Sequence, residues 1–423
     1  MYTKTTFKNG LRIITVPMKG TNTAAVLVVV GAGSRYETKE INGISHFLEH
    51  IHFKGTTKRP TAQAIAEELD AVGGEFNAAT GAEETYFYAK VGSKHLNLAL
   101  DVISDIFLNS TFKEEEINRE RGVIIEEINM MKDTPMQYVG ELFEKLLYGK
   151  ETVGWNILGE KENILKIKRE DFLNYINDHY VAKNTVVCVA GKIDEDQTIK
   201  KIKNYFTDIR EKEPKKRTKI KESQKRPQSL IQFKKTDQTH FCLGVRAYNL
   251  FQPEKYALSL LSVILGGNMS SRLFIKVRER EGLAYYIRTT AEMYTDTGYL
   301  VTQAGVDNQK VEKAIQIILN EYKEIREKGV SEKELQKAKE YLKGKTLLEM
   351  ESSDEVAAFF SNQEILTNKI LTLKEKFAKI DKVTVEDIKK IAQDIFTPQK
   401  LNLALIGPFK EKKLACHQLL QQL

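Results

Sequence analysis

Apolar residues recur along the chain with the two periods that distinguish helices from half-buried strands. The apolar run at 23–30 predicts a strand that is buried on both faces. Asn9-Gly10 predicts a hairpin turn, since both residues tolerate positive φ. In the first half we predict further strands at 76–79, 85–91 and 185–190, and helices at 43–53, 61–72, 96–108, 113–131 and 171–179.

The second half of the chain repeats this outline. A predicted strand at 241–247 matches the one at 23–30, and a predicted helix at 256–265 matches the one at 43–53. Alignment of Gly55 with Gly266 gives an offset of 266 − 55 = 211 residues. We therefore expect an α+β protein with two structurally similar domains that arose by internal duplication.

A basic segment at 211–228 separates the two halves. It contains eight Lys or Arg residues, two prolines and almost nothing apolar, which is typical of a solvated linker. The predicted organisation is an N-terminal domain at 1–210, this linker, and a C-terminal domain at 229–423.

Composition restricts the class of protein. The net charge is +7, but 65 basic residues are interspersed with 58 acidic ones, so we expect no nucleic-acid partner. The longest apolar run is far too short to span a bilayer, and no signal-peptide core precedes the first strand. The cysteines (Cys188, Cys242 and Cys416) are isolated, which suits a reducing compartment. We expect a cytoplasmic protein without a membrane partner.

The strongest chemical signal is the segment His46-Phe47-Leu48-Glu49-His50. On a helix, residues 46 and 50 share one face, so their imidazoles can bind one Zn²⁺ while Glu49 takes a proton from water. This order reverses the zinc-peptidase pattern His-Glu-x-x-His. Only roughly 0.02 chance occurrences are expected in a chain with 7 His and 58 acidic residues. The counterparts at an offset of 211 are Ala257, Leu260 and Leu261, so the second copy lacks this chemistry.

A catalytic zinc needs a third protein ligand and an open position for water. The predicted helix at 113–131 offers Glu120, Glu126 and Glu127. Glu120 and Glu127 are seven residues apart and share one face, whereas Glu126 lies about 100° away from Glu127. Spacing alone does not choose between Glu120 and Glu127.

These motifs resemble the pitrilysin/insulinase family of metallopeptidases. The resemblance is closest to the shorter branch with the mitochondrial processing peptidase beta subunit and bacterial homologues, and it covers nearly the whole chain. Besides the histidine motif, it rests on the segments 33–37 (Gly-Ser-Arg-Tyr-Glu), 76–78 (Phe-Asn-Ala), 119–127, 154–159 and 178–180. It implies two α/β-sandwich domains, the first binding zinc and the second without metal.

The resemblance also implies roles for particular residues. The family's third ligand lies about 77 residues beyond the second histidine, which selects Glu127 because 127 − 50 = 77. Glu120 then corresponds to a supporting acid that orients a histidine or the zinc water. In the second domain, Tyr285 would hydrogen-bond the substrate carbonyl and Arg278 would anchor the substrate backbone. Substrate would add as a strand along Phe76, Asn77, Ala78 and Ala79.

The resulting hypothesis is a zinc endopeptidase with one Zn²⁺ per chain, acting on extended, unfolded peptides as a homodimer. The catalytic residues would be Glu49, Tyr285 and Arg278, and the zinc ligands His46, His50 and Glu127. Two alternatives remain open. One is a non-catalytic structural subunit of a larger complex, and the other is a catalytic subunit that needs a different partner chain.

Overall fold

The computed structural model describes residues 2–409 and Leu420, and it divides into two compact units. The first unit comprises the chain up to Asn129, Trp155–Thr218 and Leu347–Ile370. The second comprises Met130–Gly154, Lys219–Thr346 and the described residues from Leu371 onwards. Within the described residues, no helix is both long and apolar enough to cross a membrane.

The first unit is built on a six-stranded sheet with the order β1-β2-β6-β3-β5-β4. Neighbouring strands are antiparallel except for β2 and β6, which are parallel. The predicted hairpin is present between β1 and β2, although of Asn9 and Gly10 only Gly10 has positive φ. The strands are β1 (Thr3–Thr6), β2 (Arg12–Pro17), β3 (Thr23–Val30), β4 (Glu75–Thr80), β5 (Thr85–Gly92) and β6 (Thr185–Gly191).

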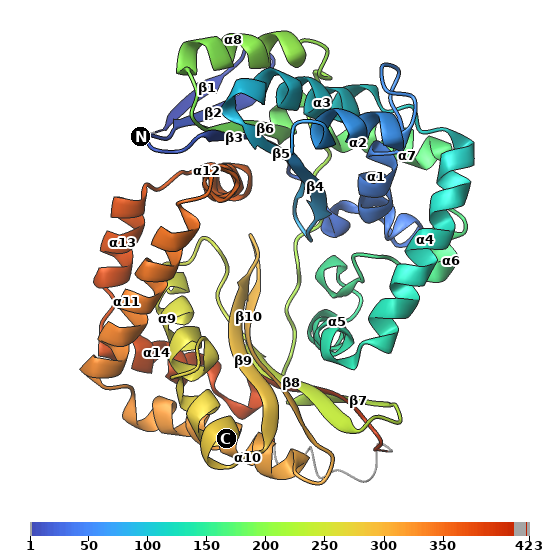
Figure 1. Ribbon diagram of the computed structural model, residues 1–423. Helices are drawn as coiled ribbons and strands as arrows, with labels where there is room; N and C mark the ends of the chain where they lie inside the picture. The colour runs from blue at the N-terminus through green and yellow to red at the C-terminus, as the bar shows by residue number, and fades with distance from the viewer. Residues whose placement is uncertain (1, 410–419, 421–423) are drawn as a thin grey trace. The chain divides into compact units, whose positions relative to one another are not determined.

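Helices cover both faces of this sheet (Figure 1). Because β3 is central, its even-numbered residues pack into one apolar core and Leu27 and Val29 into another on the opposite face, which confirms a strand buried on both sides. In Figure 1, α3 and α8 lie on one face and α12 lies on the other. The helices are α1 (Ile44–His52), α2 (Ala62–Asp70), α3 (Leu96–Asn109), α4 (Glu114–Asp133), α6 (Lys161–Ile164), α7 (Arg169–His179), α8 (Glu195–Tyr205) and α12 (Ser353–Thr367).

Helix α1 begins at a strained turn with a specific cap. Gly43 has φ 98°, and a Cβ there would lie 2.7 Å from the carbonyl oxygen of Leu158, so only glycine fits. The buried Glu37 carboxylate accepts the backbone N–H groups of Gly43 at 2.8 Å and Ser45 at 2.9 Å. These bonds satisfy donors that the helix itself leaves unpaired, and they fix where α1 starts.

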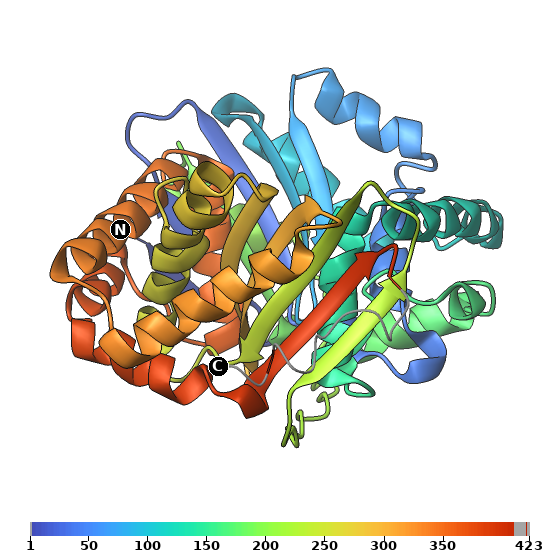
Figure 2. The ribbon, with the colours of Figure 1, turned by 90° about the horizontal axis from the view of Figure 1, so that it is seen from below.

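The second unit contains a five-stranded sheet with the order β7-β11-β8-β10-β9. In Figure 2, the red strand β11 lies between β7 and β8. Its strands are β7 (Gln228–Phe233), β8 (Gln238–Arg246), β9 (Ala284–Met293), β10 (Gly298–Asp307) and β11 (Leu401–Gly407). Its helices are α5 (Pro135–Tyr148), α9 (Lys255–Gly266), α10 (Val311–Lys328), α11 (Glu332–Glu349, its last three residues in the first unit), α13 (Leu373–Asp381) and α14 (Val385–Ile395).

The two sheets have one topology. Without β1, the order β2-β6-β3-β5-β4 corresponds strand for strand to β7-β11-β8-β10-β9. In each sheet the first pair is parallel and the other pairs are antiparallel. Among the described strands, β1 at one edge is the only difference in order, so the predicted duplication of an α/β fold is confirmed.

The units do not follow the continuous boundaries 1–210 and 229–423 expected from the sequence. Helix α5, from the N-terminal half, packs in the second unit against Cys242, Ala404 and Ile406. Helix α12, from the C-terminal half, packs in the first unit against β3 and β6. The expected linker at 211–228 does contain a unit boundary, after Thr218. An apolar helix face does not specify which sheet it covers, so sequence patterns did not reveal this exchange.

Candidate metal centre

Helix α1 presents two imidazoles on one half-buried face. His46 and His50 are one helical turn apart, and their Nε2 atoms lie 3.2 Å from each other. The opposite face of α1 packs Phe47, Leu48 and Ile51 into the core of the first unit, whereas His46 and His50 are only half-buried. The nearby His52 is fully buried and bonds the Ile106 carbonyl oxygen, so it takes no part in this group.

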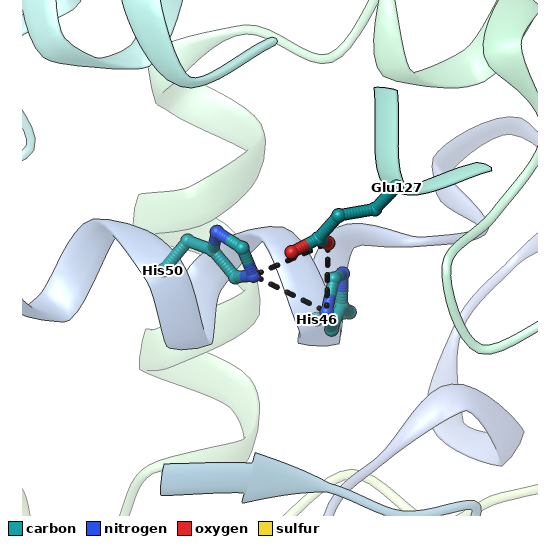
Figure 3. Close-up of side chains that lie close together, drawn as sticks. All are labelled: His46, His50 and Glu127. Atoms are coloured by element: carbon teal, nitrogen blue, oxygen red, sulfur yellow. Dashed lines mark hydrogen bonds and ion pairs between the residues drawn. The ribbon is translucent and has the colours of Figure 1, made fainter. Parts of the chain in front are cut away.

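Glu127 completes a set of three converging donor atoms (Figure 3). Its Oε2 lies 3.6 Å from the Nε2 of both His46 and His50. A tetrahedral Zn²⁺ bound at about 2.0–2.1 Å needs donor atoms about 3.3 Å apart. The observed separations are close to this value. Within the described residues, this is the one group of three His, Cys, Asp or Glu side chains arranged to hold a metal ion.

The electrostatics of the three donors also suit a cation. The buried Oε2 of Glu127 accepts no hydrogen bond from the described protein groups, an unfavourable state that a bound cation would relieve. Burial, helped by the neighbouring His50, lowers the pKa of His46 to about 3. His46 is therefore neutral near pH 7, with a ring nitrogen able to bind a metal.

Glu120 holds His50 in the tautomer that a metal ligand needs. Glu120 Oε1 lies 2.9 Å from His50 Nδ1, and Lys54 Nζ lies 2.8 Å from Glu120 Oε2. Burial opposes ionisation of Glu120, but its bonds to His50 and Lys54 outweigh this effect and lower its pKa. The carboxylate only accepts hydrogen bonds, so His50 Nδ1 carries a proton, and in the neutral ring the lone pair is on Nε2. Burial acts to lower the pKa of His50, but the bond to Glu120 and the charge of Glu127 outweigh it and raise this pKa.

Glu49 lies beside the donor group without belonging to it. The Thr80 hydroxyl donates a 2.6 Å hydrogen bond to Glu49 Oε2. Burial raises the pKa of Glu49, and this hydrogen bond partly offsets the rise. A carboxylate with a raised pKa is a stronger base, which suits proton transfer from water.

Strand β4 contains Phe76, Asn77, Ala78 and Ala79 and forms an edge of the first sheet. One side of β4 pairs with β5, and among the described residues no strand pairs with its other side. Thr80, at the end of β4, carries the hydroxyl that binds Glu49, so this edge lies next to the histidine helix. An open strand edge can pair with an extended peptide through backbone hydrogen bonds.

Arg278 and Tyr285 belong to the second unit, where both lie on irregular backbone. Arg278 lies in a π-helix, Phe274–Arg280, with its guanidinium carbon 4.8 Å from the centre of the Phe274 ring. Tyr285 is the second residue of β9, and 75% of its surface is exposed. π-Helical turns and strand irregularities are frequent at functional sites.

Sequence reasoning missed three supporting residues: Glu37, Lys54 and Thr80. Lys54 lies four residues after His50, and this spacing was the available signal that it shares the histidine face. Thr80 and Glu37 come from other segments of the chain. Their contacts with α1 depend on the tertiary fold, and no local pattern indicates them.

Comparison with known proteins identifies the family. Residues 12–161 match the family model described as insulinase (peptidase family M16), and residues 166–342 match the model of the peptidase M16 inactive domain. A Bacillus subtilis protein named "uncharacterized zinc protease YmxG" is 37% identical over 96% of this chain and 98% of its own length. The chain belongs to peptidase family M16. A Mycobacterium leprae member, named "uncharacterized zinc protease ML0855", is 33% identical over 98% of this M16 chain and 94% of its own length.

Solved structures agree with the M16 fold. A protease from Helicobacter pylori superimposes with a TM-score of 0.90 at 23% identity, covering 96% of this chain and 99% of its own. A chain of Complex III2 from Candida albicans superimposes with a TM-score of 0.85 at 20% identity, covering 99% and 98%. At these identities the likeness concerns the fold alone. It supports the assignment of two similar α/β domains.

Proposed function

We propose that this M16 chain is a zinc-dependent endopeptidase that cleaves extended, unfolded peptides and binds one Zn²⁺ per chain. The observation that carries the proposal is the convergence of His46, His50 and Glu127, with a buried carboxylate oxygen that accepts no hydrogen bond from the residues that the structure describes. Two imidazoles and a carboxylate form a donor set that zinc peptidases use. The names of the relatives, zinc proteases, favour the same ion.

Zinc, when bound, polarises the scissile carbonyl and lowers the pKa of a water towards neutrality. The chain's own residues would do the rest. Glu49 accepts the proton of the attacking water and returns it to the leaving amine nitrogen, while Thr80 keeps the carboxylate in place. Glu120 fixes the ring of His50, and Lys54 keeps Glu120 ionised.

Substrate binding is assigned to two places, one in each unit. Along β4, residues 76–79 would pair with the backbone of an extended peptide, which selects for unfolded segments with little regard to side chains. In the second unit, the exposed Tyr285 would donate its hydroxyl hydrogen to the carbonyl oxygen as charge develops there, and Arg278 would bind the peptide backbone.

The decisive experiment combines metal analysis with peptide cleavage. We expect about one zinc per chain, loss of cleavage of an unstructured peptide with a chelator, and recovery when zinc is added. Glu49→Gln should keep zinc and lose about 10²–10⁴-fold in turnover, because the base is gone while the ligands remain. Glu126→Gln is the matched control, since Glu126 is an exposed neighbour of Glu127. Undiminished turnover in Glu49→Gln would refute the assigned base.

The same measurements separate the two alternative functions. A structural subunit would leave an unstructured peptide intact, whether or not it binds zinc. A subunit that needs a different partner would be inactive alone and gain activity when that partner is added. The complete donor set in one unit, and an Arg–Tyr pair in the other, favour a self-sufficient enzyme.

We further propose that the enzyme works as a homodimer in which Tyr285 and Arg278 act on peptide held by another copy of the chain. Equal amounts of Glu49→Gln and Tyr285→Phe chains, each strongly impaired alone, should then regain activity when mixed, since mixed dimers contain one intact set of residues. No recovery after subunit exchange is proven by mass spectrometry would argue for action within one chain.

A further inference from the structure

Tyr285 is the extra residue of a β-bulge. In the antiparallel pair of β9 and β10, Tyr286 lies opposite Gly305, whereas Ala284 lies opposite Val306. Two steps along β9 lead from Ala284 to Tyr286, but only one step separates their partners on β10, so Tyr285 has no partner on β10. A bulge of this kind turns the unpaired side chain away from the regular alternation. Tyr285 accordingly has 75% of its surface exposed, although residues on both sides of it are buried or half-buried.

Tyr286 fixes the register immediately next to the bulge. Its ring crosses β10 at Gly305 and stacks on His240 of β8, with ring centres 5.9 Å apart and an angle of 25° between the ring planes. The Tyr286 hydroxyl lies 3.0 Å from His240 Nδ1. His240, Gly305 and Tyr286 are direct neighbours across β8, β10 and β9. The Tyr286 side chain therefore contacts the paired residues of both other strands.

Gly305 is the residue that makes room for this ring. A Cβ at position 305 would lie 2.5 Å from Cε1 of Tyr286 and 3.3 Å from Nδ1 of His240. Any other amino acid would therefore push the ring away. An aromatic side chain that covers a glycine on the neighbouring strand is a known means of fixing strand register.

Gln303 of β10 makes a second contact with the Tyr286 side chain. Gln303 Nε2 lies 3.4 Å from the Tyr286 hydroxyl, and Gln303 Oε1 accepts hydrogen bonds from Arg288 at 2.7 and 3.0 Å. Arg288 lies opposite Gln303 in the ladder. Two neighbouring contacts of β9 therefore support the register, one at Tyr286 and one at Arg288. Both residues follow the bulge in the chain.

We propose that the stack of Tyr286, Gly305 and His240 positions Tyr285 by fixing the strand register that makes Tyr285 the bulged residue. A one-residue slip of β9 would pair Tyr285 with β10 and reverse the direction of its side chain. Tyr286 and His240 are positioning residues, since they act through Tyr285. The proposal rests on the proposed function, in which Tyr285 contacts the substrate carbonyl.

The first test is independent of catalysis. Nitration with tetranitromethane, mapped by tandem mass spectrometry, reports which tyrosine is accessible. In the parent chain we expect nitration at Tyr285 and little at Tyr286, because Tyr286 is half-buried and burial raises its pKa. In Gly305→Ala the preference should fall or reverse, since the new methyl group displaces the Tyr286 ring. Thr290→Ala, at an exposed position of the same strand, is the control and should retain the parent pattern. An unchanged pattern in Gly305→Ala would overturn the proposal.

The second test is a double-mutant cycle in peptide cleavage. Tyr285→Phe should lower kcat by about 10²–10³-fold, as expected for loss of a donor to the developing oxyanion. Tyr286→Ala should lower kcat with little change in KM, and Tyr286→Phe should recover most of the loss because a ring still covers Gly305. In the Tyr285→Phe background, Tyr286→Ala should have almost no further effect.

The outcomes of the cycle separate this proposal from the proposed function. Additive losses in the double variant would mean that Tyr286 acts on stability or elsewhere, which overturns the positioning role. If Tyr285→Phe keeps the parent kcat while Glu49→Gln does not, the assigned role of Tyr285 fails. Nitration would then still decide whether the stack sets the register. Should Tyr286→Ala fail to fold, the milder Gly305→Ala takes its place in the cycle.

Discussion

The two units share one strand order but use the same helix in different ways. In the first unit, α1 presents His46, Glu49 and His50 on a half-buried face. In the second, the corresponding positions of α9 at an offset of 211 residues are Ala257, Leu260 and Leu261, with exposures of 4%, 0% and 0%. These positions are half-buried on α1, whereas on α9 they belong to the apolar core.

This difference shows what burial of a polar helix face requires. The α9 surface contributes to folding by burying apolar side chains, which needs no further support. The α1 surface buries polar groups that must each find a partner. Glu37, Glu120 and Thr80 provide those partners to the α1 start, to His50 and to Glu49. The second unit has no need of such a set, because its helix presents no polar face at these positions.

Removal of α12 should have the largest effect, because the first unit should no longer fold. A fragment of residues 1–218 lacks α12, so it exposes the sheet face formed by Ile14, Leu27, Val29, Val186 and Cys188. We expect this fragment to aggregate. Fusion of residues 347–370 through a flexible linker, with the α5 segment at 134–154 replaced by a second flexible linker because α5 packs in the second unit, should restore a soluble monomer. Its cooperative thermal transition is measured by circular dichroism and its size by gel filtration.

A fusion with the same residues in scrambled order is the matched control. It retains the composition and length of α12 but loses its apolar face, so it should aggregate like the bare fragment. A soluble, cooperatively folding fragment 1–218 would contradict the reciprocal exchange of helices between the units.

Reciprocal substitutions in α9 and α1 should have different effects on stability and on zinc binding. Leu261→His in α9 places an imidazole in an apolar core and should lower the free energy of unfolding by about 3–5 kcal/mol. His50→Leu in α1, at a half-buried position, should keep the fold and lose zinc. Denaturant unfolding and zinc analysis measure both. A Leu261→His chain as stable as the parent would show that α9 is less enclosed than the structure indicates.

Much of the fold and of the group His46, His50 and Glu127 could be predicted from the sequence. The features that could not be predicted have physical causes. The strand at 23–30, the helix at 43–53 and the duplicated outline follow from local periodicity, which burial and backbone geometry impose on neighbouring residues. The convergence of Glu127 on the two histidines was expected from a family resemblance, since spacing alone left Glu120 as an equal candidate. The exchange of α5 and α12, the cap by Glu37 and the bulge at Tyr285 depend on contacts between distant segments, and no local pattern encodes them.

The cap of α1 predicts a pH-dependent stability. Burial raises the pKa of Glu37 to about 7, although hydrogen bonds from Ser45, Gly43 and Asn42 act to lower it. The folded chain therefore holds this proton more tightly than the unfolded chain. The resulting stabilisation is complete below pH 4.5 and is lost as the pH rises towards 7, on the order of 3 kcal/mol in all.

Comparison of the parent with Glu37→Gln isolates this contribution, because the other titrating groups cancel. Between pH 4.5 and 7, the parent should lose stability relative to the variant. Chemical denaturation in the presence of a chelator avoids the separate pH dependence of metal binding. A difference in unfolding free energy that stays constant over this range would contradict the raised pKa.

The smallest effect is expected at Glu120, for which we propose a supporting role beside the ligand His50. Glu120→Gln keeps the shape of the side chain and replaces its charge, so the bond to His50 Nδ1 weakens and the ring is less well oriented. Zinc affinity should fall about 10–100-fold, with about one zinc still bound at saturation. Competition titration with a chromophoric chelator measures the change, and Glu126→Gln on the exposed side of α4 should match the parent. Complete loss of zinc from Glu120→Gln would instead make Glu120 a direct ligand, which is the alternative that residue spacing alone left open.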